Sequence, residues 1–212
     1  MPTITAVVPS AKREGRFDVA IDATTAGTIS VDVIERLRLH VGADVDERML
    51  EALSQETRAL HTYDRALAML ASRARASREL ARLLVRKGEP EPFVRAAIER
   101  LTGIGYLDDA AFARQFARSK LAVGGLSRRR LQSELARRGI AREVAAAAIA
   151  EMLQEEHVDE AGILDQLAAR KLHALRDEPP DVQRRRVFAF LARRGYDLDD
   201  VRAAVDRALR RA

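Results

Sequence analysis

Hydrophobic and polar positions follow two different periods along the chain. Phe17, Val19 and Ile21 alternate with polar or small residues, which is the period of a half-buried β-strand. From about Ser30 onward, apolar residues recur at the three- and four-residue spacing of a helix, and this spacing continues toward the C-terminal end. The two periods predict a small β-unit followed by a chain of helices.

The predicted β-unit consists of short segments rich in β-branched residues, separated by polar or glycine-containing turns. Ser30 is a candidate N-cap for the first helix after it, and Gly42 is expected to end that helix. We expect strands over 4–8 and 16–21, turns over 12–15 and 24–27, a short third strand over 27–30, and helices over 30–42 and 46–60.

A repeat is visible in the helical part. Three stretches each end an amphipathic helix with two basic residues and a glycine: Leu83–Gly88, Glu134–Gly139 and Phe190–Gly195. Glycine is the residue expected where a helix ends in a left-handed turn, with a hydrophobic residue such as Ile140 or Tyr196 packing back behind it. Similar helices precede and follow each stretch, so the pattern predicts a three-helix module of about fifty residues that occurs three times.

Helix-start signals support this division. Asp108 and Ser127 are candidate N-caps, with Leu107 and Phe112, and Leu126 and Leu131, as hydrophobic staples. Pro179-Pro180 is expected to start the second helix of the third repeat. The fold expected is mainly α, with tandem three-helix repeats after an N-terminal β-hairpin and helix unit. The predicted segments are 1–60 for this N-terminal unit and 61–107, 108–157 and 158–212 for repeats one to three.

Composition narrows the class of protein. Hydrophobic residues make up 47% of the 212 positions, which is enough for a core. The chain contains no cysteine, which excludes disulfides, thiolate nucleophiles and cysteine-ligated zinc. Neither a secretory signal nor an apolar run of membrane-spanning length is found, so we expect a cytoplasmic protein without a membrane partner.

Positive charge is concentrated in the second and third repeats. The formal net charge is +5, but the stretch from Ala110 to Arg138 contains a single acid, Glu134. Such a concentration favours a polyanionic partner, because clustered arginines displace counterions from phosphates. The basic residues in this stretch are Arg114, Arg118, Lys120, Arg128, Arg129, Arg130, Arg137 and Arg138, and those from Val182 to Arg194 are Arg184, Arg185, Arg186, Arg193 and Arg194.

The helix dipole separates these candidates into two groups. Arg128, Arg129 and Arg130 occupy the predicted first turn of a helix, where a positive charge is locally unfavourable, so a phosphate contact is indicated. The pairs 137–138 and 193–194 lie at predicted helix ends, where the dipole favours them, so structural stabilisation and phosphate contact explain them equally well. Aromatic residues make up only 4%, so a nucleic-acid contact is expected to involve the backbone rather than stacked bases.

The sequence gives little reason to expect an enzyme. The histidines are scattered, and glycine-rich phosphate-binding loops are missing. Asp108-Asp109 and Asp199-Asp200 lie at predicted helix starts, where capping explains them. The acidic run around His157 is interpreted as a solvated helix end. We therefore expect no catalytic residues, no metal and no cofactor.

Two segments together resemble the RecX family, whose members regulate the bacterial recombinase RecA. They are Gly105-Tyr106-Leu107-Asp108-Asp109-Ala110-Ala111-Phe112-Ala113-Arg114 and Arg128-Arg129-Arg130-Leu131-Gln132-Ser133-Glu134-Leu135-Ala136-Arg137-Arg138-Gly139-Ile140. The resemblance covers all three repeats, and the N-terminal unit looks like the extension of longer members. One departure is the loop 122–126, which has two glycines where many members carry basic residues.

The resemblance implies a curved array of three-helix repeats and a function. Such proteins bind in the groove of the RecA–DNA filament and restrain its extension, ATP hydrolysis, strand exchange and co-protease activity, in the regulation of DNA repair, recombination and the SOS response. RecA and the phosphate backbone of single- and double-stranded DNA are the implied partners of a monomer. The alternatives are a DNA-binding transcriptional regulator and a generic basic DNA-binding repeat protein. The candidate contacts are Arg114, Arg118, Lys120, Arg128, Arg129, Arg130, Arg137, Arg138, Arg184, Arg185, Arg193 and Arg194.

Overall fold

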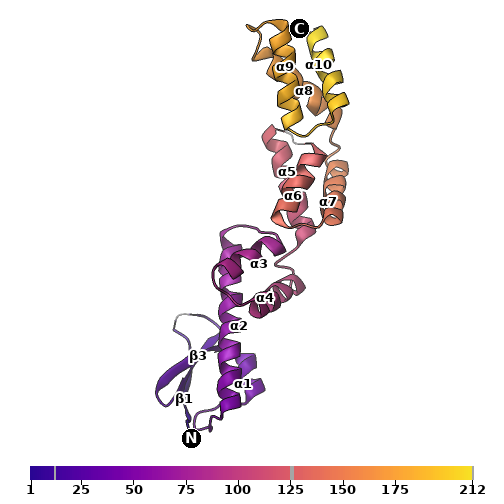
Figure 1. Ribbon diagram of the computed structural model, residues 1–212. Coiled ribbons are helices and arrows are strands. Elements are labelled where there is room, and N and C mark those ends of the chain that lie inside the picture. Colours follow the sequence, from indigo (N-terminus) through magenta and orange to yellow (C-terminus); the bar gives the residue numbers. More distant parts are fainter. Residues whose placement is uncertain (12, 125–126, 212) are drawn as a thin grey trace. The chain divides into compact units, whose positions relative to one another are not determined.

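The computed structural model describes residues 1–11, 13–124 and 127–211, with side chains omitted at 123 and 124 (Figure 1). The chain forms two compact units. The first contains Met1–Arg75 and Glu79–Leu107, and the second contains Ala76–Arg78 and the chain from Asp108 onward. The turn expected at 12–15 lies partly outside the described residues, as does the glycine loop of 122–126.

A three-stranded antiparallel sheet begins the first unit, with β1 over Ile4–Pro9, β2 over Arg16–Ile21 and β3 over Thr24–Ser30. The first two strands confirm the strands expected over 4–8 and 16–21. The turn expected over 24–27 was wrong, because these residues belong to β3 and the chain reverses at Asp22 and Ala23, both left-handed with φ of 48° and 64°. Contacts to β1 and its preceding residue stabilise this turn: Asp22 accepts a hydrogen bond from the Thr3 amide, and the Thr5 hydroxyl accepts one from the Ala23 amide.

Helices α1 (Val31–Leu37) and α2 (Glu47–Ser72) follow the sheet. Helix α1 ends earlier than expected, because Arg38 adopts a left-handed conformation directly after Leu37. Ser30 precedes the helix without a side-chain capping bond. Helix α2 begins as predicted, with Asp46 accepting from the Met49 amide. It does not stop near residue 60, where its end was expected, but continues to Ser72 in the first repeat.

The first unit has two hydrophobic cores that share α2. Ile4, Val19 and Ile29 of the sheet are buried with Leu53 of α2, and β3 contacts this helix (Figure 1). The second core forms the first repeat, where the later part of α2 packs with α3 (Ser77–Arg86) and α4 (Glu91–Gly103). Gly88 is left-handed with φ of 87°, and the amide of Glu89 donates to the Leu84 carbonyl, which is the helix ending that the sequence predicts.

The second unit contains the second and third repeats. Repeat two consists of α5 (Asp109–Gly124), α6 (Arg128–Arg138) and α7 (Arg142–Glu155), and repeat three of α8 (Glu160–His173), α9 (Pro180–Arg193) and α10 (Leu198–Arg211). The predicted caps are confirmed, since Asp108 accepts from the Ala111 amide and Ser127 from the Arg130 amide. Leu126, expected in a staple, lies outside the described residues.

Each repeat of the second unit has its own core. Leu131, Leu135 and Met152 centre the core of repeat two, and Leu191, Val201 and Ala204 that of repeat three. Gly139 and Gly195 are left-handed with φ of 92° and 85°, as the repeat pattern predicts. The expected mainly helical fold, with three-helix repeats after a small N-terminal sheet, is confirmed.

Candidate nucleic-acid interface

The candidate cations lie on three helices of the second unit. Helix α5 carries Arg114, Arg118 and Lys120, and α6 carries the residues from Arg128 to Arg130 together with Arg137 and Arg138. Helix α9 carries Arg184, Arg185 and Arg193, and Arg194 is its C-terminal cap. These helices are the first and second of repeat two and the second of repeat three. The second helices of the two repeats, α6 and α9, are therefore corresponding elements that both carry basic residues.

Many of these arginines are paired with carboxylates inside the second unit. Arg114 lies 3.1 Å from Glu151, and Arg118 lies 2.8 Å from Glu156 and 3.7 Å from Glu155, so α5 is paired with the C-terminal part of α7 and the residue that follows it. Their side chains are between a third and two thirds exposed, and ion pairs of this kind contribute about 0–1 kcal/mol. These arginines therefore have carboxylate partners within the second unit before any partner binds.

Two of the three arginines predicted in the first turn of α6 have carboxylate partners. Arg128 lies 2.5 Å from Glu160 at the start of α8, and Arg130 lies 3.2 Å from Glu134 one turn further along α6. These carboxylates supply a structural reason for two positive charges at a helix N-terminus, which the sequence did not reveal. Arg184 is likewise paired, at 2.6 Å from Asp206 of α10.

A second group of cations is exposed, and no carboxylate lies within salt-bridge distance among the described residues. This group comprises Arg129, Arg137, Arg185 and Arg193. Arg129 and Arg193 line one groove of about 640 Å³ between repeats two and three, together with Ser133, Tyr196 and Arg202. The groove is mixed in charge, since Asp199 also lines it and lies 2.8 Å from Arg202.

A third group of cations lies over aromatic rings. The Lys120 ammonium is 5.4 Å and the Arg138 guanidinium 4.7 Å from the centre of the Phe116 ring. In repeat three, Lys171 is 5.6 Å and Arg194 4.7 Å from the centre of the Phe190 ring. Lys171 is not among the candidates predicted from the sequence. The sequence does contain a signal for it. Gln166–Leu172 aligns with Gln115–Leu121, and in this alignment Lys171 corresponds to Lys120.

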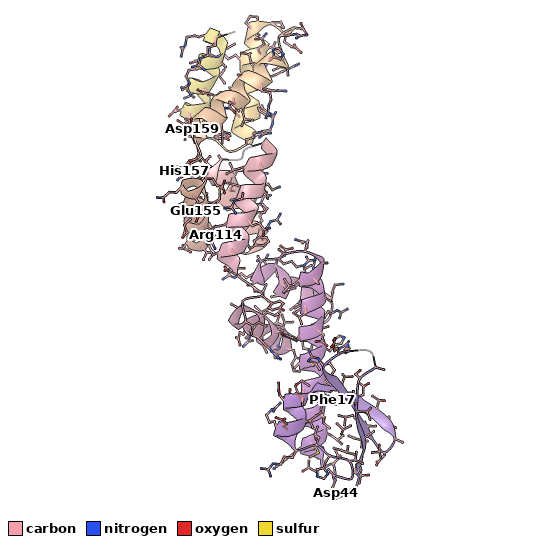
Figure 2. The ribbon with its side chains drawn as sticks, turned by 180° about the vertical axis from the view of Figure 1, so that it is seen from behind. Phe17, Asp44, Arg114, Glu155, His157 and Asp159 are labelled. Atoms are coloured by element: carbon pink, nitrogen blue, oxygen red, sulfur yellow. The ribbon has the colours of Figure 1, made fainter. Side chains whose placement is uncertain are left out.

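The acidic turn between α7 and α8 has structural partners. Figure 2 shows Glu155, His157 and Asp159 close together at this turn, and Asp159 accepts a hydrogen bond of 2.9 Å from the Gly162 amide as the N-cap of α8. Glu155 is a partner of Arg118. Within the described part of the chain, no three histidine or acidic side chains form a group that could hold a metal ion.

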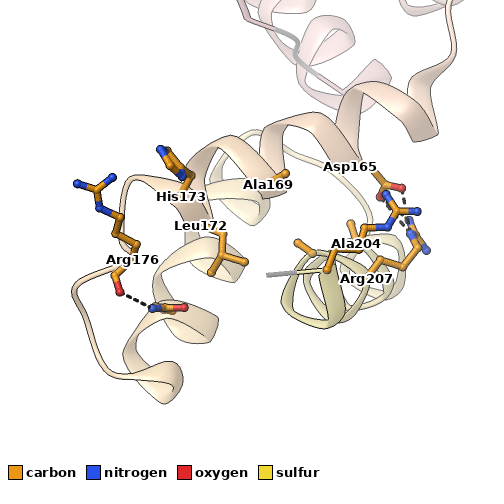
Figure 3. Close-up of a pocket in the computed structure, with 10 residues that line it drawn as sticks. Asp165, Ala169, Leu172, His173, Arg176, Ala204 and Arg207 are labelled. Atoms are coloured by element: carbon orange, nitrogen blue, oxygen red, sulfur yellow. Dashed lines mark hydrogen bonds and ion pairs between the residues drawn. The ribbon is translucent and has the colours of Figure 1, made fainter.

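Repeat three has a pocket of about 540 Å³ between α8, α9 and α10 (Figure 3). Leu172 and Ala204 form part of its apolar surface, and His173 and Arg176 lie at one side. At the other side, Arg207 holds Asp165 through two nitrogens, at 2.7 and 3.0 Å. These hydrogen bonds raise the pKa of Arg207 further and connect α8 to α10.

The fold and the site together define a class: a helical-repeat protein whose second unit presents cations suited to a polyanion. Three models of one family match the chain, described as the first, second and third three-helix domains of RecX, over residues 63–101, 108–149 and 159–205. The chain belongs to the RecX family. Within the described residues, no helix is both long enough and apolar enough to cross a bilayer.

Individual relatives agree with this assignment. The regulatory protein RecX of Mycobacterium sp. (strain KMS) is 39% identical over 140 residues, covering 64% of this chain and 74% of the relative. That of Levilactobacillus brevis is 25% identical over 193 residues, covering 91% of this chain and 71% of the relative. A crystal structure of a regulatory protein RecX aligns over 98% of this chain and 100% of its own with a TM-score of 0.80 at 22% identity, which shows the shared fold. The RecX structure from Lactobacillus salivarius gives a TM-score of 0.60 at 16% identity, over 71% of this chain and 96% of its own.

Proposed function

We propose that this protein regulates RecA by binding in the groove of the RecA–DNA filament and restraining filament extension, ATP hydrolysis, strand exchange and co-protease activity. The observation that carries the proposal is that all three helical repeats match the domains of RecX, a family of regulatory proteins. The protein then acts in the cytoplasm as a monomer, in DNA repair, recombination and the SOS response.

The candidate interface supports this function. The exposed group Arg129, Arg137, Arg185 and Arg193 is available to phosphates or to acidic groups of a protein without loss of an internal ion pair. The rings near the cations, Phe116 and Phe190, are partly buried in the repeat cores. Contact with DNA is therefore expected to involve the phosphate backbone, without base stacking.

The test is ATP hydrolysis by RecA on single-stranded DNA, with this protein titrated below the concentration of RecA. We expect inhibition at substoichiometric ratios, because a protein that binds in the filament groove affects many RecA protomers. An unchanged rate, together with direct binding to naked DNA, would instead assign the chain as a generic basic DNA-binding repeat protein. Protection of one defined operator sequence would favour a transcriptional regulator.

A matched pair of variants tests the site. Reversing charge at Arg129 and Arg137 is expected to weaken inhibition strongly, because both side chains are exposed on α6 and project from the basic second unit. Reversing charge at Arg82 and Arg95, which are exposed in the first repeat, changes the net charge equally and is expected to have a much smaller effect. Equal effects would show that net charge, rather than the assigned interface, governs inhibition.

A further inference from the structure

The first and third helices of repeats two and three are joined by the same ion pair with opposite polarity. In repeat two, Arg114 of α5 lies 3.1 Å from Glu151 of α7. In repeat three, the aligned positions hold Asp165 of α8 and Arg207 of α10, which lie 2.7 Å apart. The alignment of the two repeats therefore identifies positions that are close together in both structures.

One helical turn further along, the two repeats differ. In repeat two, Arg118 of α5 lies 3.7 Å from Glu155 of α7, which makes a second ion pair between these helices. In repeat three, Ala169 stands at the place of Arg118, and Arg211 stands at the place of Glu155. A methyl group cannot pair with a guanidinium group, so the second position of repeat three has a cation on α10 without a partner on α8.

Alanine also replaces a larger side chain on the third helix. Met152 is fully buried in the core of repeat two, and Ala208 occupies the corresponding place in repeat three. Repeat one has leucine at both places, Leu67 and Leu101. Ala169 and Ala208 both line the pocket of about 540 Å³ in repeat three (Figure 3). The pocket is therefore bordered by two alanines where the other repeats carry larger side chains.

The floor of the pocket is apolar and mostly covered. Leu172 of α8 and Ala204 of α10 line it together with Ala208, and none of the three is more than 8% exposed. Among the described residues that line the pocket, none is aromatic. Such a floor favours the hydrocarbon part of a ligand but offers no ring on which a base or another flat group could stack.

Cations without strong internal partners surround this floor. Arg211 and His173 line the pocket, and no carboxylate of the described chain lies within salt-bridge distance of either side chain. Arg176 lies 3.8 Å from Asp177, but both side chains are more than two thirds exposed, so this pair contributes little. The one acid that lines the pocket is Asp165, which Arg207 already holds. The pocket therefore favours an anion.

We propose that this pocket binds a small amphipathic carboxylate. The aliphatic body of the ligand packs on Leu172 and Ala204, and its carboxylate pairs with Arg211, because a guanidinium group can hold both oxygens of a carboxylate. The ligand then takes the place opposite the third helix that Arg118 takes in repeat two, and it connects α8 to α10. The pocket volume lies within the range of roughly 300–1,000 Å³ that is common for small-molecule sites. The inference goes beyond the proposed function, since the site takes a small molecule rather than RecA or DNA.

The test is isothermal titration of the full chain with octanoate, and with octanamide as its uncharged counterpart of nearly the same shape. We expect saturable one-to-one binding of octanoate with a Kd below about 1 mM. Octanamide should bind at least about tenfold more weakly, because it lacks the charge-assisted hydrogen bonds to Arg211. Equal binding of the two compounds, or no binding of octanoate in the millimolar range, would overturn the proposal.

Neighbouring arginines of α10 provide a matched pair of variants. Arg211→Gln removes the cation that lines the pocket and is expected to weaken octanoate binding at least about tenfold. Arg210→Gln removes the same charge from an exposed residue that does not line the pocket, and it should leave the affinity within about twofold of wild type. Similar losses in both variants would show that net charge, rather than this pocket, attracts octanoate.

A second pair of variants tests the place of the ligand. Ala169→Glu puts a carboxylate of α8 opposite Arg211 and fills part of the pocket, so octanoate binding should be lost while circular dichroism shows a folded protein. Ala150→Glu makes the same change at an exposed position of α7 and should bind octanoate as wild type does. A folded Ala169→Glu variant that binds octanoate normally would overturn the assignment to this pocket. If Ala169→Glu does not fold, the comparison of Arg211→Gln with Arg210→Gln decides.

Discussion

The hydroxyl of Ser127 donates a hydrogen bond of 2.5 Å to the carbonyl oxygen of Gly195, 68 residues away. The same hydroxyl accepts a hydrogen bond of 3.2 Å from the Arg130 amide. Ser127 therefore caps the N-terminus of α6 and also satisfies a carbonyl at the C-terminal end of α9. Because helix ends leave such groups unpaired, one buried side chain stabilises two helices and connects repeat two with repeat three.

Replacing Ser127 by Ala is expected to lower the free energy of unfolding of the second unit by about 1–2 kcal/mol, because the variant loses an N-cap and leaves the Gly195 carbonyl unpaired. Urea unfolding followed by circular dichroism measures this loss. Ser127→Thr keeps the hydroxyl and serves as the control, with most of the stability retained. Full stability of the alanine variant would mean that water replaces both hydrogen bonds.

Gly195 is sensitive to substitution because of its backbone conformation and its close neighbours. Its φ of 85° disfavours any side chain, and an added Cβ would lie 2.8 Å from the Ser127 hydroxyl and 2.9 Å from the Cβ of Arg130. Gly88 has a φ of 87° but nothing within 4 Å of such a Cβ. Gly88→Ala is therefore expected to cost about 1–2 kcal/mol from backbone strain alone, and Gly195→Ala about 1–3 kcal/mol more from crowding. Equal losses in urea unfolding would contradict the tight contact between the repeats.

Glu89 lies between α3 and α4, and its buried carboxylate connects this turn to α2. It accepts hydrogen bonds of 2.6 Å from Thr62 and 2.7 Å from Arg65, and His61 lies 3.3 Å away. Burial alone would raise the pKa of Glu89, but these hydrogen bonds and the nearby His61 outweigh it and hold the pKa below its ordinary value of 4.5. Repeats two and three have Ile140 and Tyr196 at the corresponding place, so only the first repeat uses charge there.

This lowered pKa predicts a pH dependence with a definite sign. The folded-state pKa of Glu89 lies below its unfolded-state pKa. The stabilisation that ionised Glu89 contributes is therefore complete at a pH above the unfolded-state pKa and is lost as the pH falls through the folded-state pKa. The wild-type first unit is therefore expected to lose stability more steeply below about pH 5 than the Glu89→Gln variant. At neutral pH this substitution should lower the free energy of unfolding by about 1.5–3 kcal/mol. Glu99→Gln, at an exposed position of α4, is the control. Parallel pH profiles of wild type and Glu89→Gln would contradict this account.

The N-caps and helix ends of the repeats were predictable from the sequence because they depend on local chemistry, whereas the cap expected at Ser30 and the helix end expected at Gly42 were wrong. Asp108 and Ser127 each cap a helix through an amide three residues ahead, and Gly139 supplies a left-handed turn within the same few residues. The repeat pattern then located the helices of all three modules. These features require no knowledge of which helices become neighbours.

Features that depend on distant residues could not be predicted in this way. The turn at Asp22 and Ala23 is stabilised by Thr3 and Thr5, so its own residues carry no turn signal as clear as the Thr24–Gly27 segment. The carboxylates opposite Arg114 and Arg118 come from α7 and the residue after it, more than thirty residues away, and only the packing of α5 against α7 brings them together. Charge counting along the sequence therefore overstated how many arginines are available to a partner.

Gly27 allows β3 to lie against α2. A Cβ at this position would overlap the Oγ1 of Thr57 and lie 3.0 Å from its Cγ2. Gly27→Ala is expected to destabilise the first unit by about 1–3 kcal/mol through this overlap. Thr57→Ala should cost little, because the buried Oγ1 has no hydrogen-bond partner among the described residues. The double variant removes the overlapping atoms and should recover more than half of the loss, and strictly additive losses in urea unfolding would refute the contact.

Arg128 and Glu160 allow a structural ion pair to be distinguished from a contact with the filament. Their side chains meet at 2.5 Å and connect the start of α6 to the start of α8. Arg128→Glu places two carboxylates together and is expected to weaken RecA inhibition, whichever role the arginine has.

Adding Glu160→Arg restores an ion pair of reversed polarity. If Arg128 acts only within the protein, the double variant should recover most of the inhibition of RecA ATP hydrolysis. If Arg128 contacts the filament directly, inhibition should remain impaired in the double variant. We expect recovery, because the double variant restores the internal ion pair that already neutralises the side chain at position 128. Inhibition that remains as weak as in the single variant would assign Arg128 to the interface.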